Sequence, residues 1–324
     1  MKRAAAVLAG LSVLTACGPQ PAPPPTLDAE IRPVATGGPF AAGPVRPPET
    51  GAYLGAWVKP ERFSQPGRVA AVTGYEAALG RPLDIVNTYR RFDEEFRTES
   101  DRYFVKRGAV LMLSWASGDT RSITMGQHDD LIRARAREVR EMRAPVLLRF
   151  RWEMDRPNLA ATMWSAEDYV AAWRYVRRIF DAEGVRNASW VWCPTAEGFG
   201  GGYAPPFYPG DDAVDWICVD VYAGSELVPL ARLLDPFLRW AAQRPKPIII
   251  GEYGVARAWG TERRVAWLRD AARVFRTNSQ IKAVSYFESD PDGNGPYQQF
   301  RLADDPGALA ALRELAHDRH FRSR

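Results

Sequence analysis

Short apolar segments and amphipathic helical segments alternate from residue 53 onward, and this alternation constrains the fold more than any other feature of the chain. The apolar segments are rich in β-branched and aromatic residues, which is typical of strands buried on both faces of a parallel sheet. We predict eight such strands, at residues 53–58, 83–88, 109–115, 146–153, 189–193, 216–222, 247–253 and 282–288.

Helical segments are predicted between most of the strands and after the last one. Eight β-then-α units in about 270 residues match the size of a single (β/α)8 TIM barrel, an α/β fold. The alternative is a doubly wound open sheet, but its phosphate-binding turns, GxGxxG and GxxxxGK[ST], are absent from the sequence. The predicted helices are 128–143, 166–183, 229–243, 262–277 and 308–317, with Ser165 and Thr261 as N-caps.

The first 50 residues have a different composition from the rest. Residues 1–17 join a basic start to a short apolar run and end in LTAC, which resembles a bacterial lipobox and predicts a lipoprotein signal peptide with lipidation at Cys17. An ordinary signal peptide is the alternative. Residues 18–50 are Pro-rich and predict a disordered linker, and residues 51–324 the catalytic domain. We therefore expect an extracytoplasmic protein held at the cell membrane by a lipid anchor.

Only two cysteines remain after Cys17, and both lie within predicted strands. Their positions favour two buried free thiols, Cys193 and Cys218, over a disulfide. An exported compartment still permits the bridge.

The composition narrows the classes of partner and cofactor. A formal net charge of +4 with 11 Trp and 12 Tyr argues against a nucleic-acid partner, which requires clustered Lys and Arg, and favours a ligand with flat apolar faces, such as a sugar. Three His without an HxH or HExxH motif predict no zinc site, and the lack of GxSxG argues against a serine hydrolase. We expect no metal or organic cofactor.

Two predicted strands each end in a glutamate after a matching apolar run. PVLLRFRWEMD, residues 145–155, contains Glu153, and KPIIIGEYG, residues 246–254, contains Glu252. In a (β/α)8 barrel the active site lies at the carboxyl ends of the strands, and strands four and seven face each other across the barrel mouth. Glycoside hydrolysis needs such a pair of carboxyl groups, one as acid and the other as nucleophile or base.

Further side chains at the strand ends predict the substrate-binding surface. Alternation along strand four places Arg149, Arg151 and Glu153 on one face, and we expect Arg149 to neutralise buried carboxylates. For the tryptophans, packing at the rim is the alternative to sugar stacking. The predicted substrate-binding residues are Trp115, Arg151, Trp152, Trp192, Tyr222, Tyr253 and Phe287.

Alternation along strand six places Cys218, Asp220 and Tyr222 on one face. We expect Asp220 to be a structural partner and Tyr222 to donate its hydroxyl to Glu252, which would keep that carboxylate ionised.

Several of these segments resemble glycoside hydrolase family 26, the β-mannanases and related endo-β-glycanases. The most specific is YPGDDAVDWICVDVY, residues 208–222; SWVWCP, LRFRWEMD, KPIIIGEYG and KAVSYFESD match the strands around it. The resemblance implies a retaining mechanism with Glu153 as acid/base and Glu252 as nucleophile. The family usually has HEMN around the acid/base residue, and here Trp152 and Asp155 replace its His and Asn. This departure removes a polar contact near the reacting sugar and weakens the expectation of mannan specificity.

The sequence thus predicts a monomeric, lipid-anchored retaining glycoside hydrolase of a β-mannan-like or related β-linked polysaccharide. One alternative is a carbohydrate-binding lipoprotein that keeps the cleft without turnover. Another is a scaffold that only presents loops, although aromatic-lined strand ends argue against it.

Overall fold

The computed structural model describes residues 43–321. The predicted signal peptide, Cys17 and most of the predicted linker lie outside these residues. No helix within the described range is long and apolar enough to cross a membrane.

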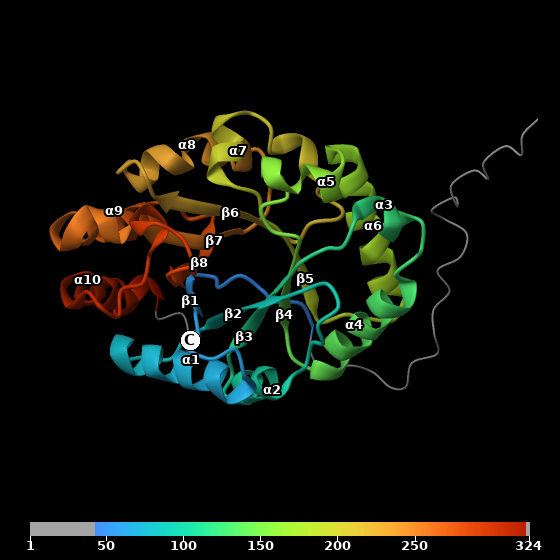
Figure 1. Cartoon of the computed structure of the whole chain (residues 1–324), viewed down its shortest axis with the longest axis horizontal. Helices are drawn as coiled ribbons and strands as arrows, with labels where there is room; N and C mark the ends of the chain where they lie inside the picture. Colours follow the sequence, from blue (N-terminus) through green and yellow to red (C-terminus); the bar gives the residue numbers. More distant parts are fainter. Residues whose placement is uncertain (1–42, 322–324) are drawn as a thin grey trace, which may run out of the picture. The chain divides into compact units, whose positions relative to one another are not determined.

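Eight parallel strands close into a barrel, with β8 paired to β1 (Figure 1). This confirms the predicted (β/α)8 barrel and excludes the open sheet. The fourth strand ends at Phe150, so residues 151–155 form the turn that follows it. The strands are β1 (Tyr53–Val58), β2 (Ile85–Arg90), β3 (Val110–Trp115), β4 (Val146–Phe150), β5 (Ala188–Trp192), β6 (Trp216–Ala223), β7 (Ile248–Val255) and β8 (Ile281–Glu288).

The helices surround the barrel (Figure 1). Ser165 caps α6 as predicted, because its hydroxyl accepts the backbone N–H of Asp168 at 3.0 Å. The predicted cap at Thr261 is wrong, since α9 already begins at Gly260. The helices are α1 (Gln65–Leu79), α2 (Glu99–Lys106), α3 (Thr120–Thr124), α4 (Asp129–Met142), α5 (Ala160–Met163), α6 (Ala166–Ala182), α7 (Ala196–Gly200), α8 (Leu230–Ala241), α9 (Gly260–Thr277) and α10 (Pro306–Ala316).

Successive side chains of each strand face either the barrel interior or the surrounding helices. The two faces form two separate apolar clusters, and the larger one lies between strands and helices. Residues of the interior cluster on the strands, or directly after one, are Ile85, Met112, Leu147, Val191, Cys193, Trp216, Cys218, Ile249 and Ala283. Val45 joins this cluster, and its backbone N–H donates to Ser189 Oγ at 2.9 Å. The last residues of the predicted linker therefore pack against the barrel.

A β-bulge in β7 sets which of its residues point inward. Val219 pairs with Ile250 and Asp220 with Glu252, so Gly251 is the extra residue. A side chain at Gly251 would meet Cys218 Sγ at 2.4 Å, which explains the glycine. Ile249 faces the interior, and strict alternation would turn Glu252, three residues later, to the outside. The bulge adds one residue, so Glu252 also faces the interior.

The structure joins Cys193 and Cys218 in a disulfide, with Cα atoms 4.3 Å apart. The predicted preference for free thiols is therefore wrong. The cause is register: Trp192 pairs with Ile217, so the next residue of each segment lies opposite the other. Both cysteines face the interior of the barrel.

Candidate active site

A cavity of about 1190 Å³ opens where the strands end. Both predicted catalytic residues line it, so the barrel brings them together as expected from their place on strands four and seven. Among its lining residues are Trp57, Tyr89, Trp152, Glu153, Tyr222, Glu252 and Phe287.

Glu252 is held by three donors from three other strands. The hydroxyl of Tyr89 and the guanidinium of Arg149 donate to its Oε1, and the hydroxyl of Tyr222 donates to its Oε2. The contact between Tyr222 and Glu252 was predicted from alternation along β6 and is confirmed. Tyr89 was not predicted as a partner of Glu252. The Glu252 side chain is buried, so the three donors replace water around its charge.

Both tyrosines keep their protons in this arrangement. Burial, followed by the negative charge of Glu252, raises the pKa of Tyr89 and of Tyr222 well above the ordinary value for tyrosine. Each hydroxyl is therefore a hydrogen-bond donor at neutral pH, and Glu252 is the acceptor.

Arg149 links Glu252 to a second buried carboxylate, as predicted. Its Nη1 lies 3.0 Å from both carboxylate oxygens of Asp220, and its Nε donates to Ser114 Oγ at 2.8 Å. Ser114 in turn donates to Asn87 Oδ1 at 2.6 Å. Burial opposes the charge of Arg149, but Asp220 and Glu252 outweigh it and raise the pKa of Arg149 above its ordinary value. One buried cation thus serves two buried carboxylates.

Glu153 lies in the turn after β4 rather than on the strand. Its backbone has a positive φ of 53°, and its N–H donates to the carbonyl of Cys193 at 2.7 Å. The prediction that Arg149, Arg151 and Glu153 share a strand face is therefore wrong, because the strand has ended before Arg151. The turn, anchored to the residue after β5, now orients Glu153.

Arg156 contacts Glu153 through two hydrogen bonds, of 2.6 and 2.5 Å. Burial raises the pKa of Glu153; the hydrogen bond from Arg156 lowers it, and the charge of Glu252 raises it. The net shift is upward. Arg156 was missed by the sequence analysis, although it follows Glu153 by three residues and carries the opposite charge.

Asp155 is not among the residues that line the cavity. Its carboxylate accepts the hydroxyl of Thr195 at 2.7 Å and the backbone N–H of the same residue at 3.1 Å. It is buried, and a side chain at Gly198 would lie 1.8 Å from its Oδ2. Asp155 therefore fixes the turn that carries Glu153 against the segment after β5.

Trp152 lies in an aromatic group on one wall of the cavity. Its ring centroid is 4.8 Å from that of Tyr89, and the Tyr89 ring is 4.8 Å from that of Trp57. The guanidinium of Arg149 lies over the Trp152 ring at 5.5 Å. Trp57 was not predicted; its position at the end of the first strand was the available signal.

The predicted substrate contacts divide into two groups. Trp152, Tyr222 and Phe287 line the cavity, as predicted. Trp115, Trp192 and Tyr253 do not: each is fully buried and belongs to the cluster between strands and helices. Trp115 alternates with the inward-facing Ser114, which explains its outward direction. Arg151 stacks on Trp152 at 5.1 Å but is not among the cavity-lining residues. The predictions of substrate contact for Trp115, Trp192 and Tyr253 are therefore wrong, whereas that for Arg151 stays a prediction.

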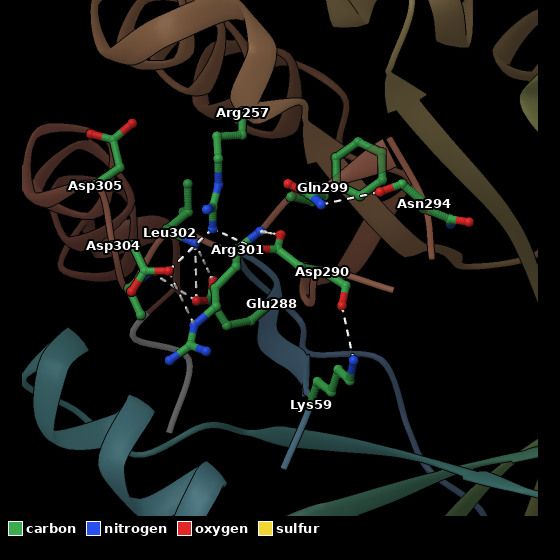
Figure 2. A network of polar contacts seen from close by, with 12 residues as sticks. Lys59, Arg257, Glu288, Asp290, Asn294, Gln299, Arg301, Leu302, Asp304 and Asp305 are labelled. Carbon is green, nitrogen blue, oxygen red and sulfur yellow. Dashed lines mark hydrogen bonds and ion pairs between the residues drawn. The ribbon is translucent and has the colours of Figure 1, made fainter. Parts of the chain in front are cut away.

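Residues 289–305, after β8, supply another wall of the cavity and are held by a polar network (Figure 2). The Glu288 carboxylate accepts the backbone N–H of Leu302 at 2.9 Å, and that of Asp290 accepts the N–H of Arg301 at 3.0 Å. Burial raises the pKa of Glu288 to about 7, against the backbone N–H groups that lower it. Glu288 is not a lining residue of the cavity. The lining carboxyl groups are Glu94, Glu153, Glu197, Glu226, Glu252 and Asp292, and among them the predicted catalytic pair is Glu153 and Glu252.

One cluster within residues 43–321 has the composition and spacing of a metal-ligand set, namely Cys193, Cys218 and Asp220. It does not suit a metal ion, because the two sulfurs are bonded to each other and Arg149 already neutralises Asp220.

Comparison with known proteins places this geometry among related barrels. Residues 109–237 match the family model of glycosyl hydrolase family 26, a segment that contains Glu153 but not Glu252. The chain is 28% identical to endoglucanase H of Acetivibrio thermocellus over 82% of its own length and 30% of that protein. It is 30% identical to the β-1,3-xylanase TXYA of a Vibrio species over 42% of its own length and 29% of that protein. The chain thus spans about a third of these relatives.

Solved structures share the fold at lower sequence identity. The catalytic domain of an endo-β-1,4-mannanase from Bacillus sp. JAMB-750 superposes with a TM-score of 0.64 at 17% identity, covering 84% of this chain and 86% of that one. A β-mannanase from Bacteroides ovatus superposes with a TM-score of 0.63 at 15% identity, covering 83% and 89%.

Proposed function

We propose, since the resemblance to glycosyl hydrolase family 26 is confirmed over residues 109–237, that this chain is a retaining glycoside hydrolase of β-linked polysaccharides. The observation that carries the proposal is that two carboxyl groups in one cavity have different surroundings. Glu252 accepts hydrogen bonds from three donors, whereas burial and the charge of Glu252 favour the protonated form of Glu153. Opposite protonation of two carboxyl groups is what glycoside hydrolysis requires.

In the proposed reaction, a carboxylate oxygen of Glu252 attacks the anomeric carbon as the glycosidic C–O bond breaks. Glu153 gives its proton to the departing sugar oxygen and becomes a carboxylate. Glu153 then takes a proton from water, and the resulting hydroxyl displaces Glu252 from the anomeric carbon. Both residues return to their starting protonation, and the product keeps the configuration of the substrate.

The substrate is expected to lie against the rings of Trp57, Trp152 and Phe287, which present apolar surface to the cavity. The relatives' names include an endoglucanase, a xylanase and mannanases. We propose a β-mannan-like or related β-glycan as substrate. The binding-protein alternative remains the second candidate, because the aromatic wall would serve either role.

The test is hydrolysis by the purified chain of a panel of mannan, glucomannan, lichenan, laminarin and xylan. NMR of the first products reports the anomeric configuration. Release of β-configured reducing ends from one polymer supports the proposal. Binding of a polymer without cleavage favours the non-catalytic alternative, and initial release of the α-anomer contradicts retention.

Arg156→Gln is expected to move the basic limb of the pH profile of kcat/KM to higher pH. Arg156 lowers the pKa of Glu153, so its loss lets the acid stay protonated to higher pH. Because the Arg156 guanidinium is half-exposed, solvent screens its charge, and the shift of the limb is expected to be small. The profile of kcat/KM reports the free enzyme. Arg269→Gln, which breaks the exposed pair with Glu314, is the control. An unchanged limb would mean that Arg156 does not set the acidity of Glu153.

We also propose that the protein is exported and anchored through a lipid on Cys17, because of the sequence LTAC at residues 14–17. That the protein is monomeric stays a prediction. Incorporation of labelled fatty acid into the chain, lost in Cys17→Ala, is the expected result. Equal labelling of that variant would contradict the anchor site.

A further inference from the structure

Five cationic side chains line the cavity, and one of them lacks an ionic partner among residues 43–321. Lys59 pairs with Asp292 at 2.6 Å, Arg90 with Asp101 at 2.7 Å, Arg91 with Asp93 at 3.4 Å and Arg156 with Glu153 at 2.5 Å. The remaining cation is Arg68, in α1. Its Nε is buried and has no hydrogen-bond partner within the described chain.

The surroundings of Arg68 explain why the protein itself does not neutralise it. The first turn of α1 contains no acidic residue. Asp101 is bound by Arg90 through both carboxylate oxygens, at 2.7 and 2.8 Å, and Glu94 accepts the backbone N–H of Arg91 at 2.6 Å. Burial, followed by the nearby positive charge of Arg90, lowers the pKa of Arg68, and the charges of Asp101 and Glu94 only partly oppose this shift. An arginine still remains charged at neutral pH. A half-buried guanidinium without a partner loses hydration that no protein group replaces.

We propose that Arg68 binds a carboxylate carried by the glycan in the cavity, so that the enzyme acts on acidic β-glycans. The guanidinium presents parallel N–H groups that match the two oxygens of a carboxylate. Phe63 also lines the cavity, five residues earlier, and is 66% exposed, so its ring is available to a sugar beside that carboxylate. This inference rests on the proposed hydrolase function and specifies its substrate class.

The experiment compares two derivatives of the panel polymer that is cleaved fastest, one carboxymethylated and one hydroxyethylated to the same degree. The two derivatives share a backbone and a similar bulk of substituent but differ in charge. The wild-type chain is expected to have the higher kcat/KM on the carboxymethylated form. Arg68→Gln is expected to lower the ratio of kcat/KM on the carboxymethylated form to kcat/KM on the hydroxyethylated form about tenfold, which corresponds to about 1.4 kcal/mol. The change is expected in KM for the carboxymethylated form, with the rate on the neutral derivative unchanged.

Two further variants separate a carboxylate site from a general effect. Arg68→Lys keeps the positive charge but lacks the two parallel N–H groups of the guanidinium. It is expected to give a ratio of the two kcat/KM values between those of wild type and Arg68→Gln, and a lower one at high salt. Arg102→Gln removes an exposed cation of α2 that does not line the cavity and is expected to match wild type. Equal losses on both derivatives in Arg68→Gln, or an unchanged ratio, would overturn the inference.

Failure of the proposed function gives a different result. If no polymer of the panel is cleaved, the hydrolase proposal fails, and retardation in native gels containing each carboxymethylated polymer then tests Arg68 alone. Stronger retardation of wild type than of Arg68→Gln supports the carboxylate site, and equal retardation overturns it.

Discussion

Replacing Glu252 by Ala is expected to lower kcat on the cleaved polymer by ~10⁴-fold or more, about 5.4 kcal/mol of transition-state stabilisation. The variant lacks the oxygen that attacks the anomeric carbon, and the cavity offers Tyr89, Tyr222 and Arg149 only as donors around the vacated position. Initial rates measured by reducing-end release provide the comparison. Glu314→Gln, an exposed glutamate of α10, is the control and is expected to match wild type.

Chemical rescue distinguishes a lost nucleophile from a damaged fold. Azide can occupy the space of the missing carboxylate and attack the anomeric carbon of an aryl β-glycoside, expelling the phenolate. The product is then an α-glycosyl azide, with one inversion instead of two. Recovery of turnover with that product identifies Glu252 as the nucleophile. In Glu153→Ala, azide is expected to yield the β-azide instead, because Glu252 still forms the intermediate. Rescue with the reverse stereochemistry would exchange the two roles.

Replacing Arg149 by Met is expected to cost about 3–5 kcal/mol of unfolding free energy and to abolish hydrolysis. The guanidinium is fully buried and is the cation that pairs with both Asp220 and Glu252. Without it, two buried carboxylates face one another uncompensated, so at least one takes up a proton to avoid the cost of an unpaired charge. Urea denaturation measures the loss, and kcat measures the effect on Glu252.

The matched test of this network is the double variant Arg149→Met/Asp220→Asn. It removes one charge of each sign and is expected to recover part of the stability lost in Arg149→Met, with an interaction free energy above about 1 kcal/mol. Activity is not expected to return, because Glu252 still lacks its cation. Additive losses in the double variant would show that Arg149 and Asp220 do not act as a pair.

The arrangement of catalytic groups was partly accessible from sequence. Alternation along β6 correctly placed Asp220 and Tyr222 on one face, and the chain order of a barrel correctly brought Glu153 and Glu252 to one cavity. The same reasoning failed for β4, because it extended the strand to residue 153. A turn with positive φ at Glu153 carries that residue instead, and a local apolar pattern does not reveal where pairing stops.

The aromatic residues show more clearly what could not be predicted from the sequence. Trp115 and Trp192 were predicted to meet sugar, yet they pack between strands and helices, while Trp57 lines the cavity. In a barrel buried on both faces, either set of alternate residues can be apolar, so sequence alone does not say which set points inward. In β7 the bulge at Gly251 also shifts that alternation, which directs Tyr253 into the outer layer and Glu252 into the cavity.

The sequence by itself determined the eight strands, five of the helices, the barrel, and the end of the barrel at which the carboxyl groups lie. These follow from local periodicity and chain connectivity. Only the tertiary structure decided which side chains face the cavity, that Cys193 bonds to Cys218, and which cations have partners. The reason is physical: within residues 43–321, Arg149 contacts Glu252 and Arg68 contacts no carboxylate because of distances between segments, and those distances exist only once the strands have closed.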